Sequence, residues 1–170
     1  MIFSIVVMSL LLGSAAIEAN GAEILYSRMT LEKGKIDYCF NATVNLPNEV
    51  VSAVLADYRY LPRLNKHIKS SSQVTTEAQT IRIFKLEKCI LNFCFNLDFE
   101  EEIQFALNRI KLVIIKNRSS FHSGSAEWRI KELSRNKTLI SIDGKLEPKF
   151  WIPPVIGQYF LDRVFNEQIT

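Results

Sequence analysis

Side chains that could carry out chemistry are few and widely spaced in this sequence. The three cysteines are Cys39, Cys89 and Cys94, and the two histidines are His67 and His122. Two histidines at these spacings do not complete a zinc site with the cysteines, and neither has a partner at the spacing of a catalytic motif. The sequence has no Gly-x-Ser-x-Gly, phosphate-binding loop or His-Glu-x-x-His. We therefore expect no metal and no other cofactor.

Two carboxylates remain as candidates for acid–base chemistry. Glu101 interrupts an otherwise apolar set of alternate residues between positions 93 and 107. If this alternation is regular, the carboxylate enters an apolar space, where desolvation raises its pKa and it can orient the polar group of a ligand. A bulge at Glu100–Glu102 would instead turn Glu101 outward, and the length of the strand favours this. Asp57 is explained more simply as a cap at a helix junction than as a catalytic residue.

Cys89 and Cys94 flank four residues and lie between two strand patterns. A hairpin with a four-residue loop would place them opposite each other, at the Cα separation of about 5.5–6 Å that suits a disulfide. We expect a Cys89–Cys94 disulfide, the alternative being two reduced cysteines of which one or both are buried. Cys39 is then a free cysteine on a strand.

The N-terminal segment has the layout of a secretory signal peptide. Residues 2–12 form an apolar run of 11 residues, followed by the small residues 13–16. This run is shorter than the roughly 20 residues of a membrane-spanning helix. We expect residues 1–19 to be removed by cleavage after Ala19 or, alternatively, after Ala22, unless they stay as an N-terminal anchor. The protein would then be exported, periplasmic or secreted, where cysteines can pair.

Composition bounds the rest of the chain. With 170 residues, 48% of them hydrophobic, the protein can build a real core, so global disorder is excluded. A net charge of +3 is too small for a dedicated nucleic-acid-binding protein. We expect one domain, residues 20–170, acting as a monomer. Its 11 Phe, 5 Tyr and 2 Trp either fill the core or line a cavity.

The elements that must position these residues are mostly strands. The patterns predict strands near 23–31, 35–45, 68–76, 80–88, 93–107, 109–118, 124–133 and 137–147, helices at 46–57 and 58–64, and an amphipathic helix after Pro154. This order predicts an α+β fold with a curved antiparallel sheet of about seven strands. The last helix is the only element long enough to cover the apolar face of the sheet, and an apolar cavity would remain between them.

Two motifs carry a resemblance to a known family. The stretch 50–58, followed by Leu61-Pro62-Arg63-Leu64, resembles a "D-Y-x-x-L-P" core, and the stretch 148–157 is similar to a "P-x-F-x-I-P-P" entrance to the last helix. Both are features of the START-like, or SRPBCC, superfamily, whose fold is called the helix-grip. The chain looks most similar to exported bacterial members of the polyketide-cyclase/coenzyme-Q-binding START-like group. The resemblance implies that a hydrophobic or lipid-like molecule binds between sheet and helix; a minority of the superfamily are enzymes.

Candidate ligand contacts are the large side chains on the inward faces of these elements, together with Glu101. They are Tyr38, Phe40, Phe84, Phe95, Phe99, Phe105, Trp128, Ile142, Leu146, Trp151, Ile156, Tyr159 and Phe160. For any one of them a plain core position is the simpler interpretation, but as a set they favour a cavity, because they come from most strands and from the last helix.

Membrane contact is a further possibility. The basic residues Arg109, Lys111, Lys116, Arg118 and Lys131 form either a solvated sheet face or a transient contact with anionic lipid headgroups. The run 150–152 either inserts at a membrane interface, gates the cavity, or packs under the last helix.

The function that we expect from the sequence is non-catalytic binding, transport or sensing of a hydrophobic ligand. One alternative is a cyclase- or dehydratase-type enzyme, for which Glu101, Tyr38 and Tyr159 are the only plausible set of polar groups. The other is a protein-interaction module of the cell envelope, which a filled cavity and a large exposed apolar patch would favour.

Overall fold

The computed structural model describes part of the chain. The described residues are 22–60, 62, 67–90 and 93–152, and the side chains of 60, 88–90 and 93–95 lie outside the description. The predicted signal peptide, the end of the predicted second helix and the predicted C-terminal helix therefore lie outside the described residues.

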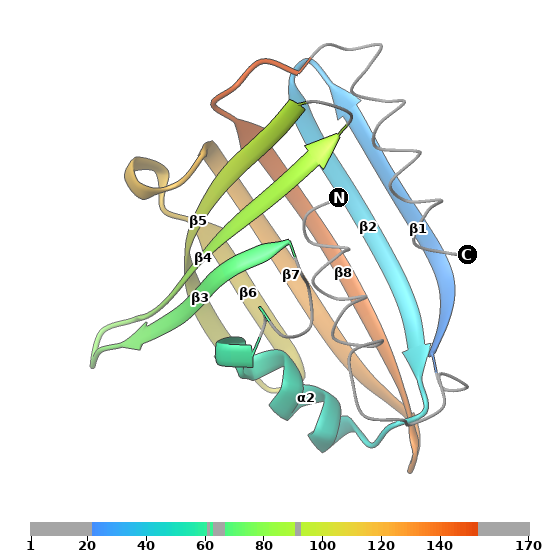
Figure 1. Ribbon diagram of the computed structural model, residues 1–170. Helices are drawn as coiled ribbons and strands as arrows, with labels where there is room; N and C mark the ends of the chain where they lie inside the picture. Colours follow the sequence, from blue (N-terminus) through green and yellow to red (C-terminus); the bar gives the residue numbers. More distant parts are fainter. Residues whose placement is uncertain (1–21, 61, 63–66, 91–92, 153–170) are drawn as a thin grey trace.

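The described residues form one antiparallel sheet and one α-helix (Figure 1). The elements are β1 (Ala22–Glu32), β2 (Lys35–Val44), α2 (Asn48–Ala56), the 3-10 turn η1 (Tyr58–Tyr60), β3 (Ile68–Thr75), β4 (Thr80–Ile90), β5 (Phe93–Ala106), β6 (Arg109–Ile114), the 3-10 turn η2 (Lys116–Arg118), β7 (Phe121–Ser134) and β8 (Lys137–Pro148). The strand order is β1-β2-β8-β7-β6-β5-β4-β3, so the first hairpin joins the rest of the sheet through β2 and β8.

The sheet has eight strands, which agrees with the eight predicted strand ranges rather than with the expected sheet of about seven. At one edge, β1 pairs with β2 through the turn at Lys33 and Gly34. Both turn residues have positive φ, 49° and 79°, and this conformation matches the twist of a tight antiparallel hairpin. The turn that Gly34 predicts is thus present.

The helix α2 begins later than its sequence signals predict. Pro47 takes the N-cap position with no side-chain hydrogen bond, and the helix begins at Asn48 instead of at the predicted residue 46. Proline suits the start of a helix because it has no N–H to satisfy there. Val51 and Leu55 are buried one turn apart and hold the helix against the sheet. After the helix, η1 delivers Tyr58 into the core.

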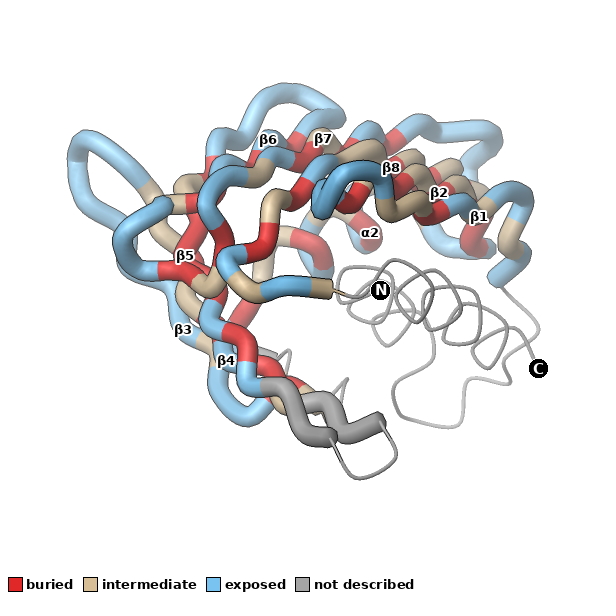
Figure 2. The backbone as a smooth tube through the Cα atoms, turned by 90° about the horizontal axis from the view of Figure 1, so that it is seen from above, coloured by how far each residue is buried: buried red, intermediate tan, exposed pale blue. Residues whose placement is uncertain are grey.

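The sheet curves strongly. Figure 2 shows β3, β4 and β5 turning away from the plane of the other strands, so that the buried residues of both parts lie on the inner side. In β2, β6 and β8 buried residues alternate with exposed or half-buried ones over much of the strand, as in Ile110, Leu112 and Ile114 of β6. We call the side that carries these buried residues the inner face.

Aromatic side chains hold the bend together. Phe84 of β4 stacks on Phe99 of β5 with ring centroids 4.4 Å apart, and Phe121 of β7 lies 4.7 Å from Phe99. Phe150, just after β8, meets Phe121 edge to face at 6.3 Å. The column therefore links strands on both sides of the bend. Among the described residues no helix is both long and apolar enough to cross a membrane.

Candidate functional site

A buried ion pair lies on the inner face where β4 meets β5. Arg82 and Glu101 are direct partners in the antiparallel register, and each is only 1% exposed. The guanidinium donates from Nε to Glu101 Oε2 at 2.9 Å and from Nη2 to the same oxygen. Burying two charges is favourable only where they satisfy each other, so their partnership explains how a carboxylate enters this apolar surface.

Regular pairing brings Glu101 to the inner face. The β4–β5 ladder shows no register shift among its described pairs, so the predicted bulge at Glu100–Glu102 is absent. The alternation of apolar residues consequently continues through Glu101, beside Phe99 and Ile103, which are both buried. The positive charge of Arg82 offsets the cost of desolvating the Glu101 carboxylate.

Aromatic rings enclose the ion pair. The guanidinium carbon of Arg82 lies 4.2 Å from the centre of the Tyr58 ring and 5.1 Å from that of Phe84. These are cation–π contacts in a desolvated environment, where they are strongest. The Tyr58 hydroxyl is also buried, and it makes no hydrogen bond of acceptable geometry with the part of the chain that the structure describes.

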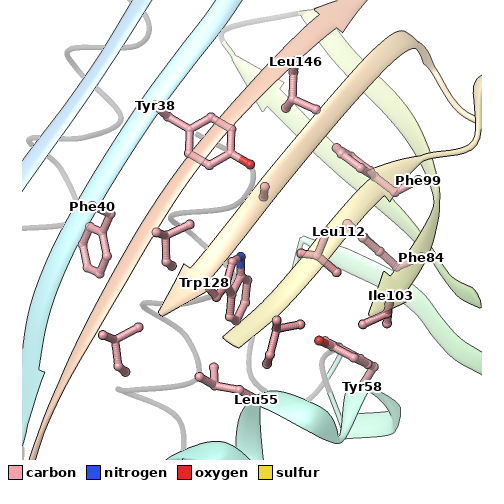
Figure 3. Packing of buried hydrophobic residues seen from close by; sticks show 14 of the residues in the cluster. Tyr38, Phe40, Leu55, Tyr58, Phe84, Phe99, Ile103, Leu112, Trp128 and Leu146 are labelled. Atoms are coloured by element: carbon pink, nitrogen blue, oxygen red, sulfur yellow. The ribbon is translucent and has the colours of Figure 1, made fainter. Parts of the chain in front are cut away.

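Tyr38 faces the same region from β2, a strand on the other side of the bend in the sheet. Its ring lies over Gly144 of β8, because a Cβ at Gly144 would come within 2.2 Å of the ring. Glycine is thus required here for the close approach of the tyrosine. In Figure 3 the hydroxyl groups of Tyr38 and Tyr58 lie on opposite sides of Trp128 of β7 within the buried cluster.

Burial controls the protonation of this group. It raises the pKa of Glu101, with Arg82 opposing the rise. Burial likewise raises the pKa of Tyr58, and that of Tyr38, where the negative charge of Glu101 adds to the effect. Both phenols therefore stay protonated and can donate hydrogen bonds. We call Tyr38, Tyr58, Arg82 and Glu101 the polar cluster.

Most of the predicted candidates that the structure describes are buried. These are Tyr38, Phe40, Phe84, Phe99, Glu101, Trp128, Ile142 and Leu146. Their contact with a ligand stays a prediction. Four further candidates, Phe95, Ile156, Tyr159 and Phe160, have side chains outside the described residues.

Two candidates are not buried. Phe105 is 49% exposed because it lies at the end of β5, just before the turn at Leu107 and Asn108. Trp151 is 79% exposed, beyond the end of β8. These two side chains are therefore exposed among the described residues, and their contact with a ligand stays a prediction.

Among the largest fully buried side chains, those of Arg82, Tyr58 and Phe121 were not predicted candidates, and neither were Leu86, Leu112 and Ile140. Arg82 was identifiable, since it shares the alternating face of Phe84 and Leu86 in β4. Phe121 was assigned to a loop but begins β7. Tyr58 was assigned to a short helix, and no periodicity indicates that it covers Arg82.

The cysteines are partly described. Cys89 and Cys94 are Cα partners in the β4–β5 ladder, which agrees with the predicted hairpin. Their side chains lie outside the description, so the disulfide stays a prediction. Cys39 is free and half-buried on the outer face of β2. Burial and a hydrogen bond with Asp143 raise the pKa of its thiol to about 11.

Other chemistry-bearing candidates are engaged elsewhere. Asp57 pairs with Arg59 at 2.8 Å, which lowers the pKa of this exposed carboxyl group. The predicted basic cluster is divided, because Arg109 pairs with Glu127 at one end of β6 while Arg118 pairs with Glu100 beyond the other end. No group of metal-binding side chains occurs among the described residues.

Comparison with known protein families identifies the family of this chain. The family model described as "Polyketide cyclase / dehydrase and lipid transport" matches residues 44–170, most of the chain. The chain belongs to this family. Its fold is START-like, with the curved antiparallel sheet that this fold requires. None of the curated proteins matches the sequence.

Solved structures show the same fold at low sequence identity. A START superfamily protein from Mycobacterium smegmatis is 18% identical, with a TM-score of 0.60 over 78% of this chain and 90% of that one. The Zhui aromatase/cyclase from Streptomyces sp. R1128 is 13% identical, with a TM-score of 0.59 over 79% and 86%. TTHA0849 from Thermus thermophilus is 15% identical, with a TM-score of 0.62 over 78% and 88%.

Proposed function

We propose that this protein binds a hydrophobic or lipid-like molecule on the inner face of the sheet, as a carrier or sensor and without catalysing a reaction. The observation that carries the proposal is the polar cluster, which is set within an otherwise apolar and aromatic surface. Such a surface with a few convergent polar groups is the usual form of a small-molecule site. The family, which includes lipid transport, supports the same class of function.

A purely structural core would not need the ion pair. Replacing a buried pair by apolar residues of similar volume is often neutral or stabilising. The pair, the buried Tyr58 hydroxyl and the Tyr38 hydroxyl together are more polar than packing requires. A role in recognising the polar part of a ligand accounts for this excess.

The direct test is native mass spectrometry of residues 20–170, purified without detergent from cells that export the full chain, followed by titration with the uncharged fluorescent probe N-phenyl-1-naphthylamine. The proposal predicts co-purifying hydrophobic molecules, or a saturable rise in probe fluorescence at about one probe per protein. Protein that is repeatedly empty and does not bind the probe would contradict it.

A matched pair of variants places the site. Ala126 is buried on the inner face of β7, whereas its neighbour Ser125 is exposed on the outer face. Ala126→Phe should weaken probe binding at least tenfold, because the added ring occupies space on the inner face, and Ser125→Phe should leave it unchanged. Circular dichroism checks that both variants fold. If they do not differ, the ligand binds elsewhere.

A second candidate is a cyclase- or dehydratase-type enzyme. It is favoured by one observation, the two phenols beside Arg82 and Glu101, which could hold and polarise the oxygen atoms of a substrate. Among the structures similar in fold is an aromatase/cyclase. Turnover of a polyketide-like substrate that Tyr58→Phe abolishes, with substrate binding retained, would establish the enzyme and exclude a simple carrier.

We propose in addition that the protein is exported and that residues 1–19 are removed. The apolar run at 2–12 and the small residues after it support this. Cell fractionation with N-terminal sequencing tests the proposal. The expected result is a mature chain that begins at Asn20 or Glu23 and is recovered outside the cytoplasm. An intact N-terminus on protein that stays in the cytoplasm would contradict it.

A further inference from the structure

We infer that the polar group of the ligand is uncharged, a hydroxyl or a carbonyl, and that Glu101 excludes ligands with a carboxylate. This inference rests on the proposed function and specifies the chemical class of the ligand. The observations behind it are the charge balance of the polar cluster and the hydrogen-bonding capacity of the polar atoms on the inner face.

The charges on the inner face already cancel. Among the described residues the buried charged side chains are Arg82, Glu100 and Glu101. Glu100 belongs to the outer side, where it accepts a hydrogen bond from the exposed Arg118 at 2.9 Å. Among the described buried residues, the inner face therefore holds one positive and one negative charge, each compensated by the other.

A ligand carboxylate would disturb this balance. It would add a second negative charge close to Glu101 in a desolvated space, and the positive charge of Arg82 is already balanced by Glu101. An uncompensated buried charge is strongly unfavourable because neither water nor a counter-ion reaches it. An acid could bind only if Glu101 took up a proton or moved away from Arg82.

A neutral group finds suitable partners in the same place. Both hydrogen bonds from Arg82 end on Glu101 Oε2, so Oε1 can accept one from a ligand hydroxyl. The Tyr58 hydroxyl is buried beside Arg82, which can only donate to it, so the Tyr58 O–H can donate to a ligand hydroxyl or carbonyl. Leaving such a hydroxyl unsatisfied is costly. A neutral ligand therefore gains hydrogen bonds at this position, whereas Glu101 repels an acid.

The experiment compares two ligands that differ only in this group. Decanol and decanoate are used at pH 8 to displace N-phenyl-1-naphthylamine from the wild-type protein. We expect decanol to displace the probe at a concentration at least tenfold lower than decanoate. In Glu101→Gln the repulsion is gone while Arg82 keeps its charge, so the preference should reverse in favour of decanoate.

Glu100→Gln is the matched control. It makes the same chemical change at the neighbouring residue of β5 but on the outer side, so it should keep the wild-type preference for decanol. Because Glu101→Gln leaves Arg82 buried without its partner, a second variant, Arg82→Met with Glu101→Leu, removes both charges. In this double variant the charge of Glu101 is absent, so the hydrophobicity of decanol and decanoate should set the preference between them.

The outcomes separate this inference from the proposed function. If neither decanol nor decanoate displaces the probe, and no probe binds, the proposed function itself fails. If both ligands compete but wild-type protein prefers decanoate, the inference is overturned while the binding function stands. It is also overturned if Glu100→Gln changes the preference as much as Glu101→Gln does.

Discussion

Burying Arg82 and Glu101 together changes what each residue can do. Alone, either would be an uncompensated charge inside an aromatic surface, with Tyr58 and Phe84 on the guanidinium. Paired, they form a neutral but strongly polar group that can hydrogen-bond without leaving a net charge. Glu101, which in the sequence looks like an isolated acid, is therefore one half of a buried ion pair.

This interdependence has a measurable energetic consequence. Glu101→Leu should lower the free energy of unfolding by about 3–5 kcal/mol, because Arg82 is left buried and unpaired. The double variant Arg82→Met/Glu101→Leu should recover most of this loss. Urea unfolding of the wild type, both single variants and the double variant gives the interaction energy. Additive losses would show that the two side chains do not depend on each other.

The Cys39 thiol should be unreactive near neutral pH, since its pKa is raised to about 11. Iodoacetamide alkylation of folded protein should be slow at pH 8 and should accelerate as the pH approaches 11. Asp143→Asn should accelerate it at pH 8, because the hydrogen bond and the negative charge that raise the pKa are removed. The control is Asp37→Asn, on the same outer face of β2; an equal acceleration there would contradict the role of Asp143.

The same shift predicts a dependence of stability on pH. The folded state holds the thiol proton more tightly than the unfolded state, whose pKa is near the ordinary value of 9.0. The contribution of Cys39 to stability is thus fully present below pH 9 and is lost as the pH rises from 9 through 11. Cys39→Ala should flatten this part of the stability profile in urea unfolding. An unchanged profile would contradict the assignment.

At the scale of elements, the β4–β5 hairpin decides where the site lies. Cys89 and Cys94 are partners in its register, and seven steps along the same ladder lead to Arg82 and Glu101. The spacing of the cysteines therefore contained the information that Arg82 faces Glu101. The alternation within each strand does not carry this information, because alternation alone does not say which residue on the next strand compensates a charge.

The hairpin also makes the disulfide testable. In exported protein that is unfolded without a reductant, only Cys39 should be alkylated, and all three cysteines should be alkylated after reduction. Mass spectrometry counts the modifications. Three modifications without reduction would contradict the Cys89–Cys94 disulfide.

The aromatic column of Phe84, Phe99 and Phe121 should contribute more to the free energy of unfolding than an exposed aromatic side chain does. Phe99→Ala removes the ring between Phe84 and Phe121 and should cost about 3–5 kcal/mol of unfolding free energy. Phe105→Ala, on the same strand but 49% exposed, should cost clearly less. Thermal or urea unfolding compares the two variants, and equal losses would show that the column does not hold the bend.

At the scale of the whole molecule, the sequence predicted most of the strands, the helix and the antiparallel order, because alternation and turn residues are local signals. It did not predict how the curved sheet brings Tyr38 of β2 and Tyr58 of η1 toward one pair of charges, because that depends on sheet curvature and on the close approach at Gly144. These are long-range properties that no local pattern contains. Of the predicted ligand contacts, those in the middle of the sheet are accordingly buried, whereas Phe105 and Trp151 at its ends are exposed. Their contact with a ligand stays a prediction.

The most direct test of ligand binding on the inner face maps the ligand on the sheet. A long-chain alcohol that carries a diazirine is bound, photolysed and located by peptide mass spectrometry, with excess decanol as competitor. We predict decanol-sensitive cross-links to inner-face residues around the polar cluster, such as Tyr38, Phe84 and Trp128. Cross-links confined to outer-face residues such as Ser125 and Arg129, or cross-links that decanol does not reduce, would contradict binding on the inner face.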